Sequence, residues 1–161
     1  MKTVIIGIAE SSIINPPDKI STLGLGSCCG VVLYDRLTKL AGMVHVMLPL
    51  AGNFKDNTNK AKFADSGVQL LYSELLTAGA SKRHVVAKLA GGAHMFANSA
   101  MQGDLLKVGE RNVQVCKETL AKQGIPLTAE DTLGTYGRTI TFDPATGVLH
   151  IKTVGLGEKE I

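Results

Sequence analysis

The stretch Thr22-Leu23-Gly24-Leu25-Gly26-Ser27-Cys28-Cys29-Gly30 places three glycines, a serine and a thiol between two apolar segments. Glycine lets the backbone turn sharply, and neighbouring N–H groups in such a turn can converge on one point. Cys28 stands where those N–H groups would converge. The stretch is therefore typical of a tight turn that presents a nucleophile, which in turn needs a base nearby.

A β-hairpin is predicted directly after this turn. Residues 30–34 form its first strand, 35–39 its polar turn and 40–48 its returning strand, which carries His45 in an otherwise apolar run. If the strands pair symmetrically about the turn, Cys28 and His45 are nearly opposite, with Cβ atoms ~5 Å apart. The turn chemistry does not fix the register, so a slip of a residue or two stays open.

The rest of the chain mixes helix and strand signals. Apolar residues recur at helical spacing over 62–78, and a second helix is predicted over about 110–123. Because strands outnumber helices and hairpins make neighbouring strands antiparallel, we expect an α+β fold. The further predicted strands cover 1–10, 19–23, 85–90, 125–127, 138–142 and 148–154.

Composition indicates an ordinary globular protein. The 161 residues suit one domain, 1–161, with a flexible C-terminal tail from about residue 155. A net charge of +3 with dispersed Lys and Arg and few aromatic residues disfavours nucleic acid as a partner. No apolar run reaches the ~20 residues of a membrane span. Three cysteines without CxxC spacing indicate free thiols in a reducing compartment, so we expect a cytoplasmic protein.

Each candidate residue also has a plain structural interpretation. Cys28 can be a small buried side chain, His45 a hydrogen-bonded core histidine and Thr22 an ordinary strand threonine. Cys29 should point to the opposite face of the strand and belong to the core. The functional alternative is a cysteine–histidine pair, with Thr22 orienting the imidazole and backbone N–H groups around Gly26, Ser27 and Cys28 forming an oxyanion hole.

Metal and nucleotide sites are not expected. Adjacent cysteines on a strand diverge, so Cys28, Cys29 and His45 lack an obvious fourth zinc ligand. The glycines at Gly24, Gly26 and 91–92 have neither the GxGxxG nor the Gly-Lys-Ser/Thr pattern of phosphate-binding loops. We therefore predict no metal and no cofactor.

Six motifs match one protein family in order and spacing. They are Thr22-Leu23-Gly24-Leu25-Gly26-Ser27-Cys28, Gly42-Met43-Val44-His45-Val46-Met47-Leu48-Pro49, Lys62-Phe63-Ala64-Asp65, Ala87-Lys88-Leu89-Ala90-Gly91-Gly92-Ala93 with Met95-Phe96, Gly109-Glu110-Arg111-Asn112, and Glu130-Asp131-Thr132. They span nearly the whole chain, which thus resembles the CheD chemoreceptor glutamine deamidases.

This resemblance implies hydrolysis of particular glutamine side chains to glutamate in the cytoplasmic part of methyl-accepting chemotaxis receptors, through a cysteine thioester. Cys28 then matches the family's nucleophile, His45 its base and Thr22 the third member. The implied fold has largely antiparallel or mixed sheets in a sandwich-like core with two main helices on one side, similar to the catalytic core of cytotoxic necrotizing factor deamidases. The implied partner is a CheC-type phosphatase.

Two other functions fit the same residues. A non-catalytic adaptor would use the fold only to bind and stimulate a CheC-type phosphatase. A thiol peptidase or transglutaminase would use the same cysteine chemistry with another acyl donor or acceptor. Neither alternative is separated from deamidation by residue spacing alone.

Overall fold

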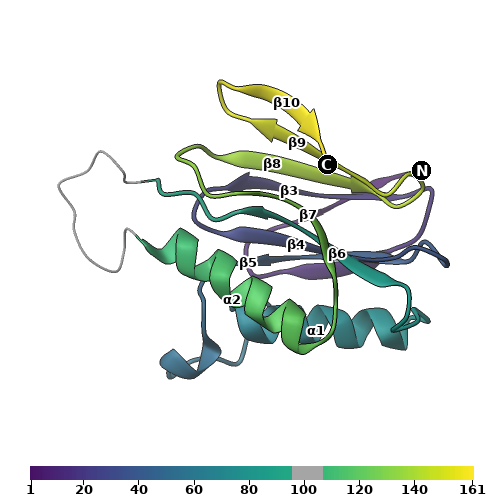
Figure 1. The fold of residues 1–161 in the computed structure, drawn as a ribbon, viewed down its shortest axis with the longest axis horizontal. Coiled ribbons are helices and arrows are strands. Elements are labelled where there is room, and N and C mark those ends of the chain that lie inside the picture. The colour runs from purple at the N-terminus through teal and green to yellow at the C-terminus, as the bar shows by residue number, and fades with distance from the viewer. Residues whose placement is uncertain (96–106) are drawn as a thin grey trace.

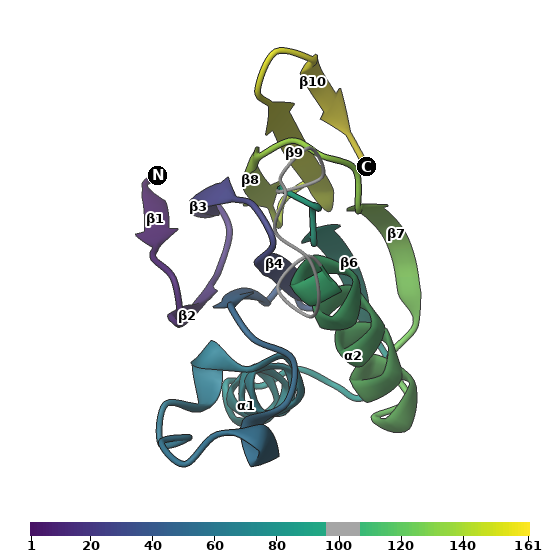
Figure 2. The same ribbon diagram turned by 90° about the vertical axis from the view of Figure 1, so that its left-hand side faces the viewer.

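The structure of the chain, a computed structural model, describes residues 1–95 and 107–161. Within them, two five-stranded sheets pack face to face, and two α-helices lie against one side of the sandwich (Figure 1, Figure 2). The first sheet has the strand order β1-β3-β8-β9-β10 and the second β2-β5-β4-β6-β7. The predicted α+β class, with its sandwich and its two helices on one side, is confirmed.

The elements have the following bounds: β1 Thr3–Ile6, β2 Ser11–Ile14, β3 Lys19–Leu25, β4 Cys29–Asp35, β5 Ala41–Val46, α1 Ala64–Thr77, β6 Val85–Gly91, α2 Val108–Lys122, β7 Leu127–Thr132, β8 Arg138–Asp143, β9 Val148–Thr153 and β10 Gly157–Glu160. Two short 3-10 helices, η1 Ala51–Asn53 and η2 Lys60–Lys62, precede α1. Both predicted helices are confirmed. Phe96, at the end of one family motif, lies outside the described residues.

Apolar side chains fill two layers. Ile20 and Phe142 of the first sheet and Met43 of the second belong to the layer between the sheets. Val44 and Leu71 of α1 belong to the layer between the second sheet and the helices. Because β4 and β5 are covered on both faces, every residue in them is buried. Their sequences are therefore nearly continuous apolar runs, in which a histidine stands out.

The hairpin of β4 and β5 has a register that differs from the symmetric prediction. Gly30 lies opposite His45, and Cys29 lies opposite Val46. The Asp35 carboxylate accepts hydrogen bonds from the backbone N–H groups of Leu37 and Thr38, which shapes the turn from inside. Cys28 is consequently diagonal to His45, two residues before its direct partner. Diagonal positions on one face are ~7–8 Å apart, which longer side chains still span.

The chain ends differ from two sequence-based predictions. The strand predicted over 1–10 covers only Thr3–Ile6 as β1; the chain turns at Ala9, whose φ is 62°, and a separate strand, β2, follows in the other sheet. The flexible tail predicted from about residue 155 is also wrong, since β10 pairs antiparallel with β9. Charged residues with few apolar neighbours made this edge strand look like a solvated tail.

A buried ion pair joins the two sheets beside β10. Arg138 of β8 is 1% exposed and donates from Nε to Asp131 of β7 at 3.0 Å. Lys159 of β10 reaches the other Asp131 oxygen at 2.7 Å from a half-exposed position. Burial raises the Asp131 pKa, but the hydrogen bonds from Lys159 and Arg138 outweigh it, so the pKa lies below its ordinary value. The carboxylate is therefore charged at neutral pH.

No helix in the described ranges is long and apolar enough to cross a membrane.

Replacing Asp131 with alanine should destabilise the fold by ~3–5 kcal/mol, because the buried guanidinium of Arg138 is left without its counter-charge. Replacing Lys159 with alanine is the matched control, and should change stability by less than ~1 kcal/mol because that ammonium is solvated. Urea unfolding followed by circular dichroism measures both. Equal losses in the two variants would contradict the role given to the buried pair.

Candidate active site

Three segments bring the predicted catalytic residues to one end of the sandwich. Thr22 lies on β3 in the first sheet, and His45 lies on β5 in the second. Cys28 lies in the turn that connects β3 to β4 and packs against the layer between the sheets. Thr22 and His45 are completely buried, whereas Cys28 is partly exposed. A substrate can therefore approach the thiol from solvent while the other two side chains stay inside.

Thr22 determines which nitrogen of His45 carries the proton. Its Oγ1 lies 2.7 Å from His45 Nδ1 and 2.8 Å from the carbonyl oxygen of Ile6. A hydroxyl has one proton and a carbonyl oxygen only accepts, so both contacts are satisfied when Thr22 donates to Ile6 and accepts from Nδ1–H. The neutral imidazole is then the Nδ1–H tautomer. Its Nε2 has a free lone pair.

His45 Nε2 has no hydrogen-bond partner among the described residues, although it is shielded from solvent. Buried polar atoms are nearly always paired, so each exception calls for an explanation such as a catalytic role. Burial also lowers the His45 pKa below its ordinary value of 6.5, because the charged form loses its hydration. At neutral pH the ring is therefore an unprotonated base.

Cys28 is a neutral thiol in this state. Burial, with a smaller contribution from the neighbouring Cys29, raises its pKa to about 11, although a hydrogen bond from its own backbone N–H acts in the opposite direction. Thr22 and His45 are in direct contact, whereas no hydrogen bond joins Cys28 to His45, and the two form no ion pair at rest. Cys29 is fully buried in the helix-side layer with Cys116, as the alternation along the strand predicts.

The turn Gly26-Ser27-Cys28, called the nucleophile turn here, has all three of its carbonyl groups hydrogen-bonded to other segments. The Gly26 oxygen accepts from Ala93 N–H and the Cys28 oxygen from Gly92 N–H, both at 2.9 Å. The Ser27 oxygen accepts from the Asn112 side chain, also at 2.9 Å. In the turns and loops of the described residues, no backbone carbonyl accepts from the N–H groups of Gly26, Ser27 and Cys28, and the Cys28 N–H lies against its own sulfur. These are donors that an oxyanion hole requires.

The loop that follows β6 depends on glycine for this contact. Gly91 has a φ of 109° and Gly92 a φ of 69°, a region that favours glycine. A Cβ at Gly91 would collide with the carbonyl oxygen of Cys28. The close approach of the two segments is therefore possible only without a side chain at this position.

Sequence reasoning assigned no role to Asn112 or to 91–92, although both occur in the quoted motifs. The signal for Asn112 is a polar residue within the buried face of an amphipathic helix. The signal for the glycines is a pair at the end of a buried strand. These patterns mark Asn112 and the two glycines as unusual for their positions. They do not predict that these residues contact the turn of Cys28.

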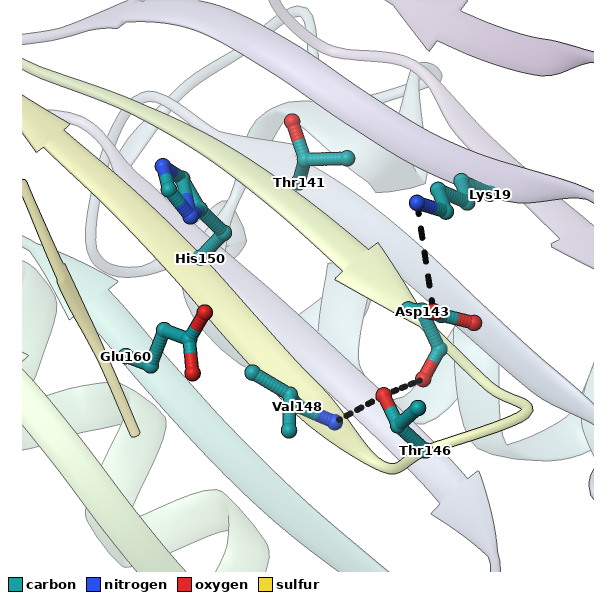
Figure 3. Close-up of a pocket in the computed structure, with 7 residues that line it drawn as sticks. All are labelled: Lys19, Thr141, Asp143, Thr146, Val148, His150 and Glu160. Atoms are coloured by element: carbon teal, nitrogen blue, oxygen red, sulfur yellow. Dashed lines mark hydrogen bonds and ion pairs between the residues drawn. The ribbon is translucent and has the colours of Figure 1, made fainter.

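A separate hollow of about 430 Å³ lies on the first sheet and is shown in Figure 3. Lys19 and Asp143 pair across it at 3.9 Å, and the Thr146 hydroxyl donates to the Asp143 carbonyl. The candidate catalytic residues are not among those that line it. The hollow is therefore distinct from the candidate active site.

Among residues 1–95 and 107–161, no three His, Cys, Asp or Glu side chains gather as metal ligands.

A family profile and individual relatives point to the same protein family. A family profile described as CheD chemotactic sensory transduction matches residues 47–153. A protein of Caldanaerobacter subterraneus named probable chemoreceptor glutamine deamidase CheD is 49% identical, over 99% of this chain and 98% of its own length. A protein of the same name from Lachnoclostridium phytofermentans is 53% identical, over 97% of this chain and 96% of its own.

A third relative, from Halalkalibacterium halodurans, is named chemoreceptor glutamine deamidase CheD. It is 48% identical over 97% of this chain and 96% of its own length. Thr22, Cys28 and His45 precede the part matched by the family profile. The relatives' alignments extend over almost the whole chain.

The tautomer of His45 is directly measurable. We expect ¹⁵N NMR of the imidazole to show the Nδ1–H form, with a titration midpoint below 6.5 because burial disfavours the cation. In the Thr22→Val variant the Nδ1–H form should lose its acceptor and the Nε2–H form should gain population. A wild-type ring in the Nε2–H form, or one that titrates above 6.5, would contradict the assignment.

Proposed function

The chain belongs to the CheD family, and from that membership we propose that it is a chemoreceptor glutamine deamidase, a protein-glutamine glutaminase, in which Cys28, His45 and Thr22 carry out the reaction. The substrates are glutamine side chains in the cytoplasmic domains of methyl-accepting chemotaxis receptors. The products are glutamate side chains and ammonia.

One observation carries the assignment of residues. The His45 ring is buried, its Nδ1 is held by Thr22, and its Nε2 is unpaired among the described residues. A histidine kept only for packing would have no reason to leave this nitrogen unsatisfied. A general base needs that free lone pair, and Cys28, two residues before the direct strand partner of His45, is the thiol that would give it a proton once substrate draws the two together.

In the first step His45 Nε2 takes the thiol proton as Cys28 Sγ bonds to the carboxamide carbon of the glutamine. The carbonyl oxygen becomes an oxyanion, which accepts hydrogen bonds from the N–H groups of the Gly26-Ser27-Cys28 turn. When the carbon–nitrogen bond breaks, His45 returns its proton to the leaving ammonia. A thioester between Cys28 and the substrate remains.

In the second step His45 Nε2 takes a proton from water, whose oxygen attacks the thioester carbon. The carbon–sulfur bond then breaks, Cys28 recovers a proton from His45, and a glutamate side chain is released. Thr22 accepts from Nδ1–H throughout and stabilises the imidazolium that forms in each step. No redox step and no cofactor is required.

The resting protonation states determine the timing of proton transfer. The Cys28 pKa of about 11 lies far above that of His45, so a thiolate–imidazolium pair does not accumulate before substrate binds. Proton transfer therefore accompanies attack on the carbonyl, while the oxyanion donors stabilise the charge that develops. The substrate itself completes the catalytic arrangement.

The setting of the reaction follows from the same membership. The enzyme acts in the cytoplasm, where reduced thiols persist, and the described cysteines Cys28, Cys29 and Cys116 are free. A CheC-type phosphatase is its proposed partner. If the chain were only an adaptor for that phosphatase, loss of the thiol would leave partner binding intact and there would be no ammonia release to lose.

Replacing Cys28 with alanine should abolish ammonia release from a receptor cytoplasmic fragment, because no other group can form the thioester. His45→Ala should lower the rate by ~10²- to 10⁴-fold through loss of the base. Cys116→Ala is the matched control, a buried thiol on α2 whose removal should leave the rate near that of the wild type. Ammonia assays with mass-spectrometric mapping of converted glutamines measure all three.

Retained turnover in Cys28→Ala would overturn the assignment of the nucleophile. Cleaved or cross-linked fragments would instead indicate a peptidase or transglutaminase, because deamidation leaves the chain intact and unlinked.

A further inference from the structure

Asn112 is a polar residue in the buried layer between α2 and the second sheet. It is 0% exposed, and Val113, Cys116 and Leu120 of the same helix are buried around it. Its side-chain nitrogen Nδ2 donates to the carbonyl oxygen of Ser27 at 2.9 Å and to that of Met47 at 3.0 Å. One carboxamide thus joins α2, the nucleophile turn and the end of the strand that carries His45.

The orientation of this carboxamide is fixed by its partners. Both neighbours of Nδ2 are carbonyl oxygens, which only accept, so the reversed orientation would place Oδ1 against two acceptors. In the observed orientation Oδ1 has no partner among the described residues, although it is shielded from solvent. Asn112 therefore leaves its own acceptor unpaired in order to donate two hydrogen bonds.

The bond to Ser27 also orients the N–H of Cys28. The Ser27 carbonyl and the Cys28 N–H belong to one planar peptide group, in which they point in opposite directions. Fixing the carbonyl toward α2 consequently aims the Cys28 N–H away from α2. No backbone carbonyl of the described turns and loops accepts from that N–H, and it lies against the Cys28 thiol, where the oxyanion would form.

The hydrogen bond from Asn112 to Met47 holds the segment that carries His45. Met47 follows β5 and stands two residues after His45, and its N–H donates to the Lys62 carbonyl at 2.7 Å. The same Asn112 nitrogen thus fixes the distance between the nucleophile turn and the end of the base's strand. Neither bond touches a group that reacts.

We propose that Asn112 is a positioning residue of the deamidase, which aligns the Cys28 N–H as an oxyanion donor and holds the Cys28 turn against the strand of His45. The inference rests on the proposed function and adds to it a residue outside the catalytic three. Because the effect is on charge that develops during the reaction, it should appear in kcat rather than in substrate binding.

The test uses the full chain and a receptor cytoplasmic fragment as substrate. Asn112→Ala removes both donors, and Asn112→Leu removes them while keeping side-chain size, which protects folding if the smaller side chain does not. In each folded variant we expect kcat to fall by ~10- to 10²-fold, in line with the loss of an oriented oxyanion donor. We expect KM to change by less than ~3-fold, because substrate contacts are unaltered.

Thr119→Val is the matched control. Thr119 is buried on the same helix, but its hydroxyl donates only to the Val115 carbonyl within α2. Its loss should leave kcat near the wild-type value, which separates a general effect on α2 from the link to the turn. Circular dichroism melts establish that each variant is folded.

The positioning role predicts a fall in kcat that is specific to the Asn112 variants. A folded Asn112→Leu with wild-type kcat, or with a rise in KM that accounts for the whole loss of kcat/KM, would overturn the positioning role. A fall in kcat shared equally by Thr119→Val would overturn it as well. Cys28→Ala, assayed in parallel, tests the proposed function separately, because turnover in that variant would remove the nucleophile assignment whatever Asn112 does.

Discussion

The hydrogen bond between Thr22 Oγ1 and His45 Nδ1 connects the two sheets and determines the chemistry that the site can perform. It requires that β3 and β5, which belong to different sheets, lie face to face with both side chains directed into the layer between them. The Ile6 carbonyl then takes the threonine proton, so that the histidine must donate from Nδ1. A base at Nε2 is thus a consequence of how the sandwich is packed.

The same packing explains why neither Cys28 nor His45 is charged in the absence of substrate. Burial keeps the imidazole unprotonated and raises the pKa of the Cys28 thiol to about 11, so both groups are neutral at rest. The turn's carbonyls are bound by Ala93, Asn112 and Gly92, while no backbone carbonyl of the described turns and loops accepts from its N–H groups. Stabilisation is therefore available only when a negative charge develops beside the thiol. In the proposed mechanism, a thiol with these properties resists unwanted reactions and becomes a nucleophile only toward a bound amide.

The sequence predicted the class of fold, both helices and the central hairpin because their apolar patterns are long and regular. Cys28, His45 and Thr22 were chosen from a glycine-rich turn and a histidine in an apolar strand, and the structure brings Thr22 and His45 into contact. The observed register is shifted by two residues from symmetric pairing, within the slip that the turn chemistry left open, and the Asp35 side chain shapes the turn from inside. The contacts of Asn112 with Ser27 and Met47 are long-range, so no local pattern encodes them. The hairpin of β9 and β10 is local, but the charged residues of β10 resemble a solvated tail.

The most direct test of this account is the pH dependence of kcat/KM for glutamine conversion by the wild-type chain. A neutral imidazole base acting on a neutral thiol predicts a rise through a single acid limb with its midpoint below 6.5, followed by a plateau to about pH 9. A rate that instead keeps rising with pH toward the thiol pKa of about 11 would mean that free thiolate is the reactive form. That result would contradict the role of His45 and, with it, the mechanism.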